Sequence, residues 1–140
     1  MKLKNTKIKG LKIMQGKNFF DSRGFFREIF IKKKIKVHKP IFWCMSKSKK
    51  NVLRGLHLQT KNSQEKFVSV IKGKILDVVI DLRKKSQTFG KNFQIILSEK
   101  NAKSILIPSG CAHGFLGLDN ENIVVYSNNN YRTKKSEIGL

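Results

Sequence analysis

The stretch Phe67-Val-Ser-Val-Ile71, Lys72-Gly73, Lys74-Ile-Leu-Asp-Val-Val-Ile-Asp-Leu82 decides the fold class. Both halves are short and rich in β-branched residues, and a glycine at position 73 supplies the turn between them. Because strand side chains alternate between two faces, Asp77 and Asp81 lie together on one face of the second half. We therefore predict two strands joined as a hairpin.

Further short strands are predicted on both sides of this hairpin. Residues 3–14 alternate loosely between apolar and basic, as in edge strands, and residues 25–30 read as a strand with Glu28 between two phenylalanines. Residues 31–41 are basic and contain a proline, which indicates a surface connection. Residues 42–45 are a short apolar run, and further strands are expected at residues 93–97, 104–107 and 123–126.

The pattern as a whole predicts an all-β protein. No window has the sustained periodicity of a helix, and many short strands separated by turns are typical of a jelly-roll sandwich or barrel. A chain of 140 residues is long enough for one domain with a real hydrophobic core. We expect residues 1–140 to form that single domain.

The chain is strongly basic, with 30 Lys and Arg against 9 Asp and Glu and a net charge of +21. Such a charge suits a partner that carries phosphate: nucleic acid, a membrane surface or a phosphorylated substrate. However, lysine outnumbers arginine several-fold and the basic runs are scattered along the sequence. This favours solvated lysines over a nucleic-acid-binding face, so we predict no nucleic-acid partner.

The remaining composition points to the cytoplasm. No apolar run has the length of a membrane span, and the N-terminal residues include no apolar signal-peptide segment, so no membrane partner is expected. Cys44 and Cys111 are the only two cysteines and lie far apart in the sequence. They are expected to be free thiols in a reducing compartment.

A polar cluster, Arg54-Gly-Leu-His57-Leu-Gln59 with Lys66 soon after, stands just before the apolar strand at Phe67. Polar groups beside a core strand must be paired or must face a cavity, so the cluster predicts the floor of a ligand pocket. A histidine and a lysine from one strand pair suit proton abstraction next to a developing negative charge. Taken alone, a polar edge of a β-protein fits the cluster equally well.

Six motifs follow one another along the sequence. They are Asp21-Ser-Arg-Gly-Phe-Phe-Arg-Glu28, Val52-Leu-Arg-Gly-Leu-His57, Asp77-Val-Val-Ile-Asp-Leu-Arg83, Thr88-Phe-Gly90, Leu97-Ser-Glu-Lys-Asn101 and Ile107-Pro-Ser-Gly-Cys-Ala-His-Gly-Phe115. In this order they resemble the motifs of the dTDP-4-dehydrorhamnose 3,5-epimerase family, whose members are cupin-type jelly rolls. The likeness runs from about residue 19 to the end of the sequence.

The resemblance implies inversion of carbon 3, carbon 5 or both in a nucleotide-linked 4-keto-6-deoxy sugar, with dTDP as the expected nucleotide, for deoxysugar and surface polysaccharide synthesis. A proton beside a ketone is acidic because the carbanion delocalises onto oxygen as an enolate. By the family pattern, His57 removes the proton and Tyr126 returns one on the opposite face. Lys66 would stabilise the enolate.

The same resemblance implies a substrate-binding set and a homodimer. Arg54 and His113 match positions that hold the diphosphate and line the pocket. Arg23, Phe26 and Glu28 match a segment that family members lend to the neighbouring subunit, so the N-terminal strands of a homodimer would be exchanged.

Metal-binding cupins place a second histidine where this chain has Gln59, and a glutamate about where it has Lys66. An ammonium repels a divalent cation, and two imidazoles with one amide are a poor ligand set. We therefore expect neither a metal nor another cofactor, and assign Gln59 to substrate binding.

Three departures from the family pattern leave alternatives open. The family's base-orienting aspartate lies well beyond the segment matching Glu137–Gly139, and the sequence ends at Leu140. Three alternatives follow: the aspartate lies in a segment absent from this sequence, the protein catalyses slowly without it, or it is a family member that binds without reacting. Residues 42–44 are more apolar than the family's polar segment, and Tyr131 and Arg132 stand where a second aromatic is usual. These changes would also fit a GDP-linked sugar.

Overall fold

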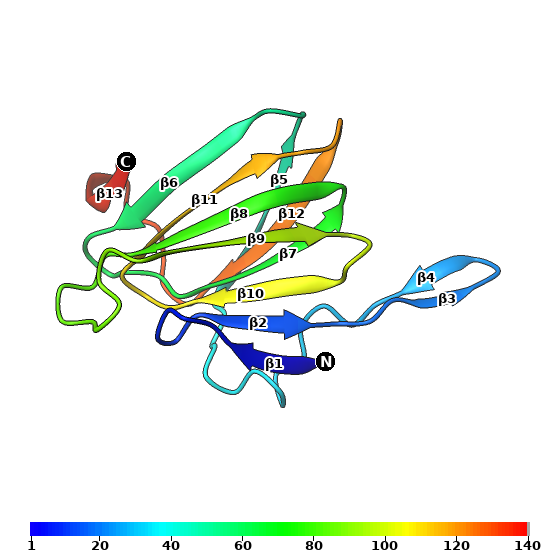
Figure 1. Cartoon of the computed structure of the whole chain (residues 1–140), viewed down its shortest axis with the longest axis horizontal. Coiled ribbons are helices and arrows are strands. Elements are labelled where there is room, and N and C mark those ends of the chain that lie inside the picture. The colour runs from blue at the N-terminus through cyan, green and yellow to red at the C-terminus, as the bar shows by residue number, and fades with distance from the viewer. Residues whose placement is uncertain (140) are drawn as a thin grey trace.

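The computed structural model describes residues 1–139 as two antiparallel sheets packed face to face (Figure 1). One sheet has, in spatial order, β1 (Lys2–Asn5), β2 (Lys12–Gln15), β10 (Lys103–Ile107), β7 (Lys66–Lys72), β12 (Asn122–Asn128) and β5 (Phe42–Ser48). The other has β13 (Glu137–Gly139), β6 (Leu53–Gln59), β11 (Cys111–Gly117), β8 (Lys74–Asp81) and β9 (Asn92–Ser98). A short 3₁₀ turn, η1 (Lys134–Ser136), precedes β13.

This arrangement confirms the predicted all-β, cupin-type jelly roll. The strands at residues 93–97, 104–107 and 123–126 are found as β9, β10 and β12, and residues 3–14 contain the edge strands β1 and β2. Strands β6, β11 and β13 complete the second sheet. Across residues 1–139 there is no helix of the length and apolarity needed to cross a membrane.

The prediction of a hairpin at residues 67–82 is wrong, although both strands exist. Strand β7 pairs with β10 and β12, whereas β8 pairs with β9 and β11, so the chain changes sheets at Gly73. Gly73 has φ +80°, and a Cβ there would lie 2.2 Å from the Glu121 carbonyl oxygen. A turn with glycine at this position is compatible with a hairpin and with a change from one sheet to the other. Pairing with strands distant in the sequence selects the change of sheet.

The hydrophobic core lies between the sheets. Every second residue of β8 points inward, so Ile75 and Val79 pack in the core while Asp77 and Asp81 are buried beside them. The other fully buried core side chains are Ile8, Leu11, Val68, Val70, Leu97, Ile105, Ile107 and Val124. This apolar packing holds the sheets together along most of their length.

A second apolar cluster lies on the outer face of the six-stranded sheet. Phe67, Leu106 and Met14 pack there against Ile35, which belongs to the connection before β5. The expectation that residues 31–41 only follow the surface is therefore wrong, since both Ile35 and His38 are fully buried. The connection supplies the apolar cover that this face of the sheet needs.

His38 anchors this connection to two strands. Its Nδ1 lies 2.7 Å from Glu65 Oε1, and its Nε2 lies 2.8 Å from Ser127 Oγ. Glu65 immediately precedes β7, and Ser127 lies in β12. A buried imidazole that uses both nitrogens in this way fixes the position of the connection relative to both strands.

The strand predicted at residues 25–30 is shorter than expected. Strand β4 (Gly24–Phe26) ends at Phe26 and forms a small hairpin with β3 (Phe19–Asp21). The extended pattern stops there because Arg27 turns back to the body, where it donates hydrogen bonds to the carbonyls of Val70 (2.7 Å) and Glu99 (3.0 Å). Glu28 and Phe26 therefore do not share a strand face.

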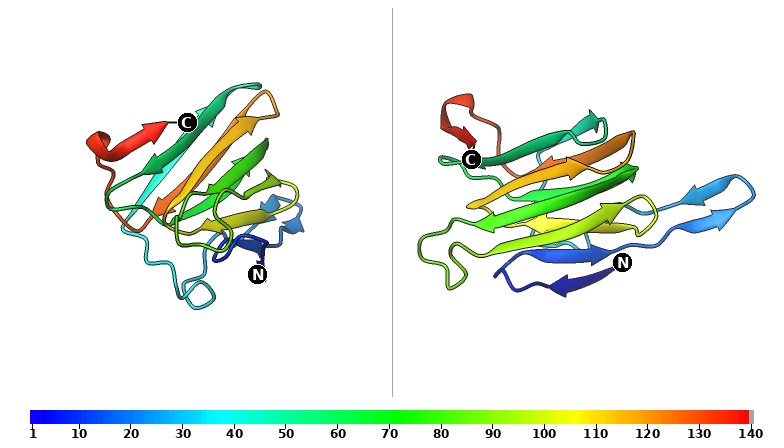
Figure 2. Two further views of the ribbon diagram at one scale, coloured as in Figure 1. Left: turned by 60° about the vertical axis from the view of Figure 1, so that its left-hand side comes forward. Right: turned by 45° about the horizontal axis from the view of Figure 1, so that its top comes forward.

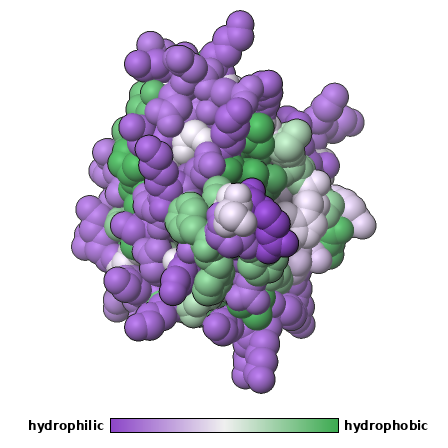
Figure 3. Space-filling view, turned by 90° about the vertical axis from the view of Figure 1, so that its right-hand side faces the viewer, coloured by the Kyte–Doolittle hydropathy of each residue, from purple (hydrophilic) through white to green (hydrophobic). Residues whose placement is uncertain are grey.

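The β3–β4 hairpin projects from one end of the sandwich (Figures 1 and 2). Figure 3, which faces this end, shows hydrophobic side chains gathered around the centre and hydrophilic ones over most of the rest. All four phenylalanines of the hairpin are exposed, Phe20 by 75% and Phe26 by 67%, with Phe19 and Phe25 less so. An apolar extension of this kind is unusual on a solvated surface.

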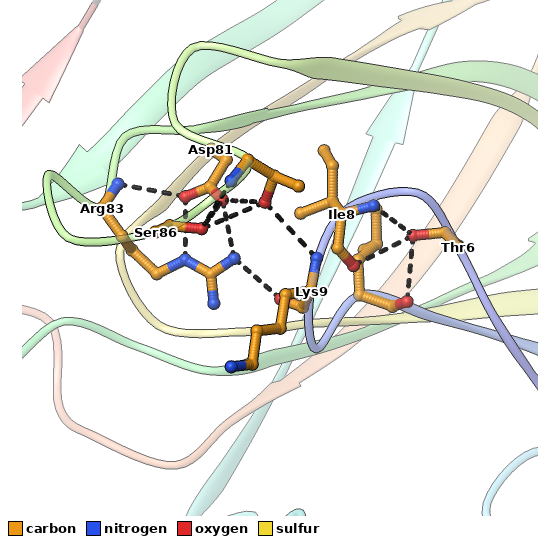
Figure 4. A network of polar contacts seen from close by, with 8 residues as sticks. Thr6, Ile8, Lys9, Asp81, Arg83 and Ser86 are labelled. Carbon is orange, nitrogen blue, oxygen red and sulfur yellow. Dashed lines mark hydrogen bonds and ion pairs between the residues drawn. The ribbon is translucent and has the colours of Figure 1, made fainter.

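A buried carboxylate organises the loop after β8 (Figure 4). The Asp81 side chain is fully buried and accepts hydrogen bonds from Arg83 Nε (2.8 Å), Ser86 Oγ (2.6 Å) and Thr88 Oγ1 (2.6 Å). The Arg83 guanidinium also donates to the Lys9 carbonyl, which ties the β1–β2 turn to the same loop. These donors, Arg83 foremost, hold the pKa of Asp81 well below its usual range.

We predict that Asp81→Asn lowers the free energy of unfolding at pH 7 by about 3 kcal/mol, because it removes one partner of a buried ion pair. Since the folded-state pKa of Asp81 is lowered, the advantage of the aspartate is full above about pH 5. It declines as pH falls through the ordinary aspartate value of 3.8 and is lost below the folded-state pKa. Urea denaturation of both proteins at several pH values measures this difference.

The matched control is Asp119→Asn. Asp119 lies 3.7 Å from Lys74, and both side chains are 46% exposed. Removing such a surface pair should cost less than about 0.5 kcal/mol. Equal losses in the two variants would contradict the role assigned to Asp81.

Candidate functional site

A cavity of about 580 Å³ opens between the two sheets at the end where β6, β7, β11 and β12 meet the C-terminal segment. Its walls mix polar and apolar side chains, as ligand pockets do. The lining residues that carry polar or ionisable groups are Cys44, Arg54, His57, Gln59, Gln64, Lys66, His113, Tyr126, Asn128, Arg132 and Glu137.

His57 and His113 stand opposite each other on paired strands β6 and β11. The strands approach closely because residue 55 is a glycine with φ +92°, where a Cβ would lie 2.5 Å from the His113 carbonyl oxygen. His113 Nε2 lies 2.8 Å from Asp77 Oδ2, and the Asp77 side chain is fully buried. His57 is more open, with half of its side chain exposed to the cavity and solvent.

Lys66 enters the cavity from the other sheet. The prediction that His57 and Lys66 come from one strand pair is wrong, because β6 and β7 belong to different sheets and the two residues face the cavity from opposite walls. Burial lowers the pKa of the Lys66 ammonium, an effect that the nearby Glu137 carboxylate opposes. A desolvated ammonium of this kind interacts strongly with negative charge formed beside it.

Tyr126 and Cys44 lie on the same wall as Lys66. They are cross-strand partners on β12 and β5, and both line the cavity. Burial raises the pKa of the Tyr126 hydroxyl, so it stays protonated and can donate a proton or a hydrogen bond. Burial likewise raises the pKa of Cys44, which keeps its thiol neutral.

The guanidinium of Arg54 places a positive charge at the mouth of the cavity. Its Nε donates to Ser48 Oγ at 2.8 Å and one terminal nitrogen donates to the Lys47 carbonyl at 3.1 Å. Neither partner is charged, so the guanidinium keeps its positive charge available for an anionic group.

The C-terminal segment closes one side of the cavity. Strand β13 pairs with β6, so that Glu137 stands opposite Gln59. Glu137 Oε2 accepts hydrogen bonds from Arg132 Nε (2.5 Å) and Gln59 Nε2 (3.2 Å). Arg132 lowers the pKa of Glu137, which therefore stays ionised in the working pH range.

Six of the nine site residues predicted from the sequence meet in this cavity: Arg54, His57, Gln59, Lys66, His113 and Tyr126. The amide of Gln59 is already engaged, because its oxygen also accepts from Thr133 N (3.2 Å) and Ser136 Oγ (2.9 Å). Arg23, Phe26 and Glu28 do not line the cavity of their own chain. They lie on or beside the projecting hairpin, where Arg23 pairs with Asp21.

The whole chain is similar to proteins of one kind. Its sequence matches the dTDP-4-dehydrorhamnose 3,5-epimerase family over residues 5–140. It is 40% identical over 146 residues to the dTDP-4-dehydrorhamnose 3,5-epimerase of Shigella flexneri, covering 100% of this chain and 81% of that protein. The chain belongs to the dTDP-4-dehydrorhamnose 3,5-epimerase family.

Solved structures of family members have the same fold. The epimerase of Legionella pneumophila in complex with dTDP-4-keto-L-rhamnose is 38% identical, with a TM-score of 0.94 over 99% of this chain and 77% of that one. The dTDP-4-dehydrorhamnose 3,5-epimerase of Elizabethkingia anophelis is 39% identical, with a TM-score of 0.90 over 100% of this chain and 80% of that one. The sequence-based assignment to this epimerase family is confirmed.

The sequence analysis gave no role in the site to five polar residues of the cavity lining, or to Asp77, which pairs with His113; the five are Cys44, Gln64, Asn128, Arg132 and Glu137. Asp77 carries a recognisable signal, since it alternates with the inward-facing Val79 and is a carboxylate in a core strand. Cys44 and Glu137 reach the cavity only through long-range pairing of β5 with β12 and of β13 with β6. No local pattern predicts such pairings.

The side chains that line the cavity are poorly suited to bind a metal ion. Gln59 is bonded to protein groups and the Lys66 ammonium shares the cavity with the two histidines, so the geometry offers a divalent cation no favourable shell. In the part of the chain that the structure describes, no group of three or more His, Cys, Asp or Glu side chains is arranged to hold a metal ion.

We predict that a maleimide reagent labels native protein at Cys44 and not at Cys111. Cys44 faces the cavity, whereas Cys111 is buried and its pKa is raised to about 11 by burial. Mass spectrometry after a timed reaction at pH 8 counts and locates the labels. The Cys44→Ser protein should take up no label until it is unfolded, and early labelling at Cys111 would contradict the buried position of that thiol.

Proposed function

We propose that this protein is a metal-independent epimerase that inverts carbon 3, carbon 5 or both of a nucleotide-linked 4-keto-6-deoxy sugar. The observation that carries the proposal is the placement of His57 and Tyr126 on opposite sheets, with both side chains lining one cavity. Inversion needs a base on one face of a flat enolate and an acid on the other. A sugar ring held between the two sheets meets both.

His57 acts as the base. Its half-exposed imidazole reaches into the cavity and takes the proton from the carbon next to the ketone, whose electrons pass onto the ketone oxygen. Tyr126, kept protonated by burial, gives a proton to the opposite face of the same carbon. The proton balance closes when His57 returns its proton to solvent and Tyr126 recovers one.

Lys66 stabilises the enolate oxygen. Its ammonium is the most deeply placed cation of the cavity, and it stands on the strand beside the one that carries Tyr126. Because it is partly desolvated, its attraction to an enolate is much stronger than that of a lysine in water. The paired His113 and Asp77 lie across the cavity and fix the wall against which the sugar packs.

A nucleotide-linked sugar carries a diphosphate, and membership of the family favours dTDP as the nucleotide. The Legionella pneumophila relative was solved with dTDP-4-keto-L-rhamnose. In this chain Arg54, whose guanidinium contacts only uncharged groups, supplies a cation at the cavity. We place the reaction in the cytoplasmic synthesis of deoxysugars for surface polysaccharides, where nucleotide-linked sugars are made.

We further propose that the active unit is a homodimer in which the β3–β4 hairpin completes the neighbour's site. Four exposed phenylalanines on a projecting hairpin are costly in water and suit burial against a second copy. Arg23, Phe26 and Glu28 lie outside the cavity of their own chain and would bind the nucleotide of the other. In such a dimer the two copies are related by a two-fold axis, and each copy inserts its own hairpin at the cavity of the other.

In heavy water, the protein should place deuterium at carbon 3, carbon 5 or both of the 4-keto sugar nucleotide. His57→Asn should lower this exchange by about two to four orders of magnitude, because the amide cannot accept the proton. Tyr126→Phe should still exchange the proton taken by His57 but give no inverted product. Mass spectrometry and proton NMR of the sugar follow both events.

Lys66→Met serves as the third variant, and it should slow exchange at both carbons because both pass through one enolate. If the unmutated protein binds dTDP but exchanges no proton above the buffer rate, the protein is a non-catalytic binder. Binding of GDP sugars in preference to dTDP sugars would change the substrate and leave the chemistry intact.

Mixed dimers test the exchanged hairpin. A chain with Arg23→Ala and Phe26→Ala lacks a working hairpin, and a His57→Asn chain lacks the base, so each alone should be inactive. When the two chains are refolded together in equal amounts, about half of the dimers are mixed. One of the two sites in each mixed dimer is complete, so about a quarter of the unmutated activity is restored. Mixed dimers that form without restoring activity would rule out the exchange.

A further inference from the structure

Among residues 1–139, Glu137 is the carboxylate that approaches His57. Its Oε1 lies 3.7 Å from His57 Nδ1, and the carboxylate is only 17% exposed. The separation is longer than a hydrogen bond, and about half of the His57 side chain is exposed rather than enclosed by protein. Catalytic hydrogen bonds are commonly long in ligand-free sites and shorten when the substrate binds.

The two oxygens of Glu137 have different partners. Oε2 is held by Arg132 Nε at 2.5 Å and by Gln59 Nε2 at 3.2 Å, so the carboxylate cannot swing away. Oε1 has no other hydrogen-bond donor within the described residues and faces His57. The carboxylate is therefore fixed through one oxygen and presents the other to the imidazole.

Strand β13 brings Glu137 beside the imidazole through its pairing with β6, in which Gly139 stands opposite His57. The other ionisable groups around the imidazole offer no substitute for Glu137. Lys66, Arg54 and Arg132 are cations, Tyr126 is a protonated phenol, and His113 is already paired with Asp77.

We propose that Glu137 is the positioning residue of His57: it accepts the Nδ1 proton and so leaves Nε2 free to act as the base. The inference rests on the proposed function and assigns to this chain's own Glu137, Arg132 and Gln59 the task of orienting the base. The lowered pKa of Glu137 supports it, because the carboxylate remains charged when the imidazole gains its second proton. An adjacent negative charge stabilises that imidazolium.

The arrangement makes a distinctive prediction for Glu137→Gln. Arg132 and Gln59 both donate to the Oε2 position, so the oxygen of the new amide must settle there and its NH₂ group must face His57. That NH₂ donates to Nδ1, which moves the histidine proton to Nε2 and removes the base. Glu137→Ala leaves the ring unguided but imposes no wrong tautomer.

The experiment measures the tautomer of His57 by NMR of protein labelled with ¹⁵N-histidine, which has only three histidines to assign. We expect the proton on Nδ1 in the unmutated protein, on Nε2 in Glu137→Gln, and on both in Glu137→Ala. Lys135→Gln is the matched control from the same segment, and it should keep the proton on Nδ1 because Lys135 is exposed and takes no part in holding the Glu137 carboxylate. The signals of His38 and His113 report whether each variant keeps its fold.

Proton exchange into the sugar nucleotide gives the second readout. Glu137→Gln should lose about a thousandfold and Glu137→Ala only about tenfold, whereas a purely structural role would make the larger truncation worse. A His57 tautomer that is the same in all variants, or an alanine variant weaker than the glutamine one, would overturn the proposal. If the tautomers change as expected but no protein exchanges protons, the positioning stands and the epimerase function fails.

Discussion

The burial of the Lys66 ammonium between the two sheets is the constraint around which the site is built. A desolvated cation requires polar neighbours, and the cavity supplies them from both walls: Glu137 on one side, Tyr126 and Cys44 on the other. The apolar core keeps the sheets together along the rest of their length, which leaves this end open. The open end is thus a consequence of polar groups that cannot be packed into an apolar core, and it leaves a desolvated cation facing the cavity.

Much of the fold could be predicted from the sequence because the signals were local. Alternation and turn residues located β7, β8, β9, β10 and β12, and six motifs identified the jelly roll. The hairpin at Gly73 was wrong because a glycine turn does not record which strands pair beyond it. The course of residues 27–41 was missed for a similar reason, since its basic sequence hides Ile35 and His38, which are buried against strands distant in the sequence.

The same distinction between local patterns and long-range pairing separates the site residues that could be predicted from those that could not. His57, Lys66 and Tyr126 were predictable because each stands in or beside a recognisable motif or strand, and all three line the cavity. Glu137 was not, although its Glu-x-Gly segment was noted, because its approach to His57 depends on the pairing of β13 with β6. Arg23, Phe26 and Glu28 could be connected with a site only through the family, since their own chain keeps them away from its cavity.

The buried His38 connects the segment that follows the β3–β4 hairpin to the wall of the cavity. The chain leaves the hairpin and runs across the outer face of the six-stranded sheet, where the imidazole contacts Glu65 and Ser127. These residues are the immediate sequence neighbours of Lys66 and Tyr126, whose side chains point to the other side of the same sheet. One buried side chain outside the cavity therefore fixes the backbone that carries two of the residues lining it.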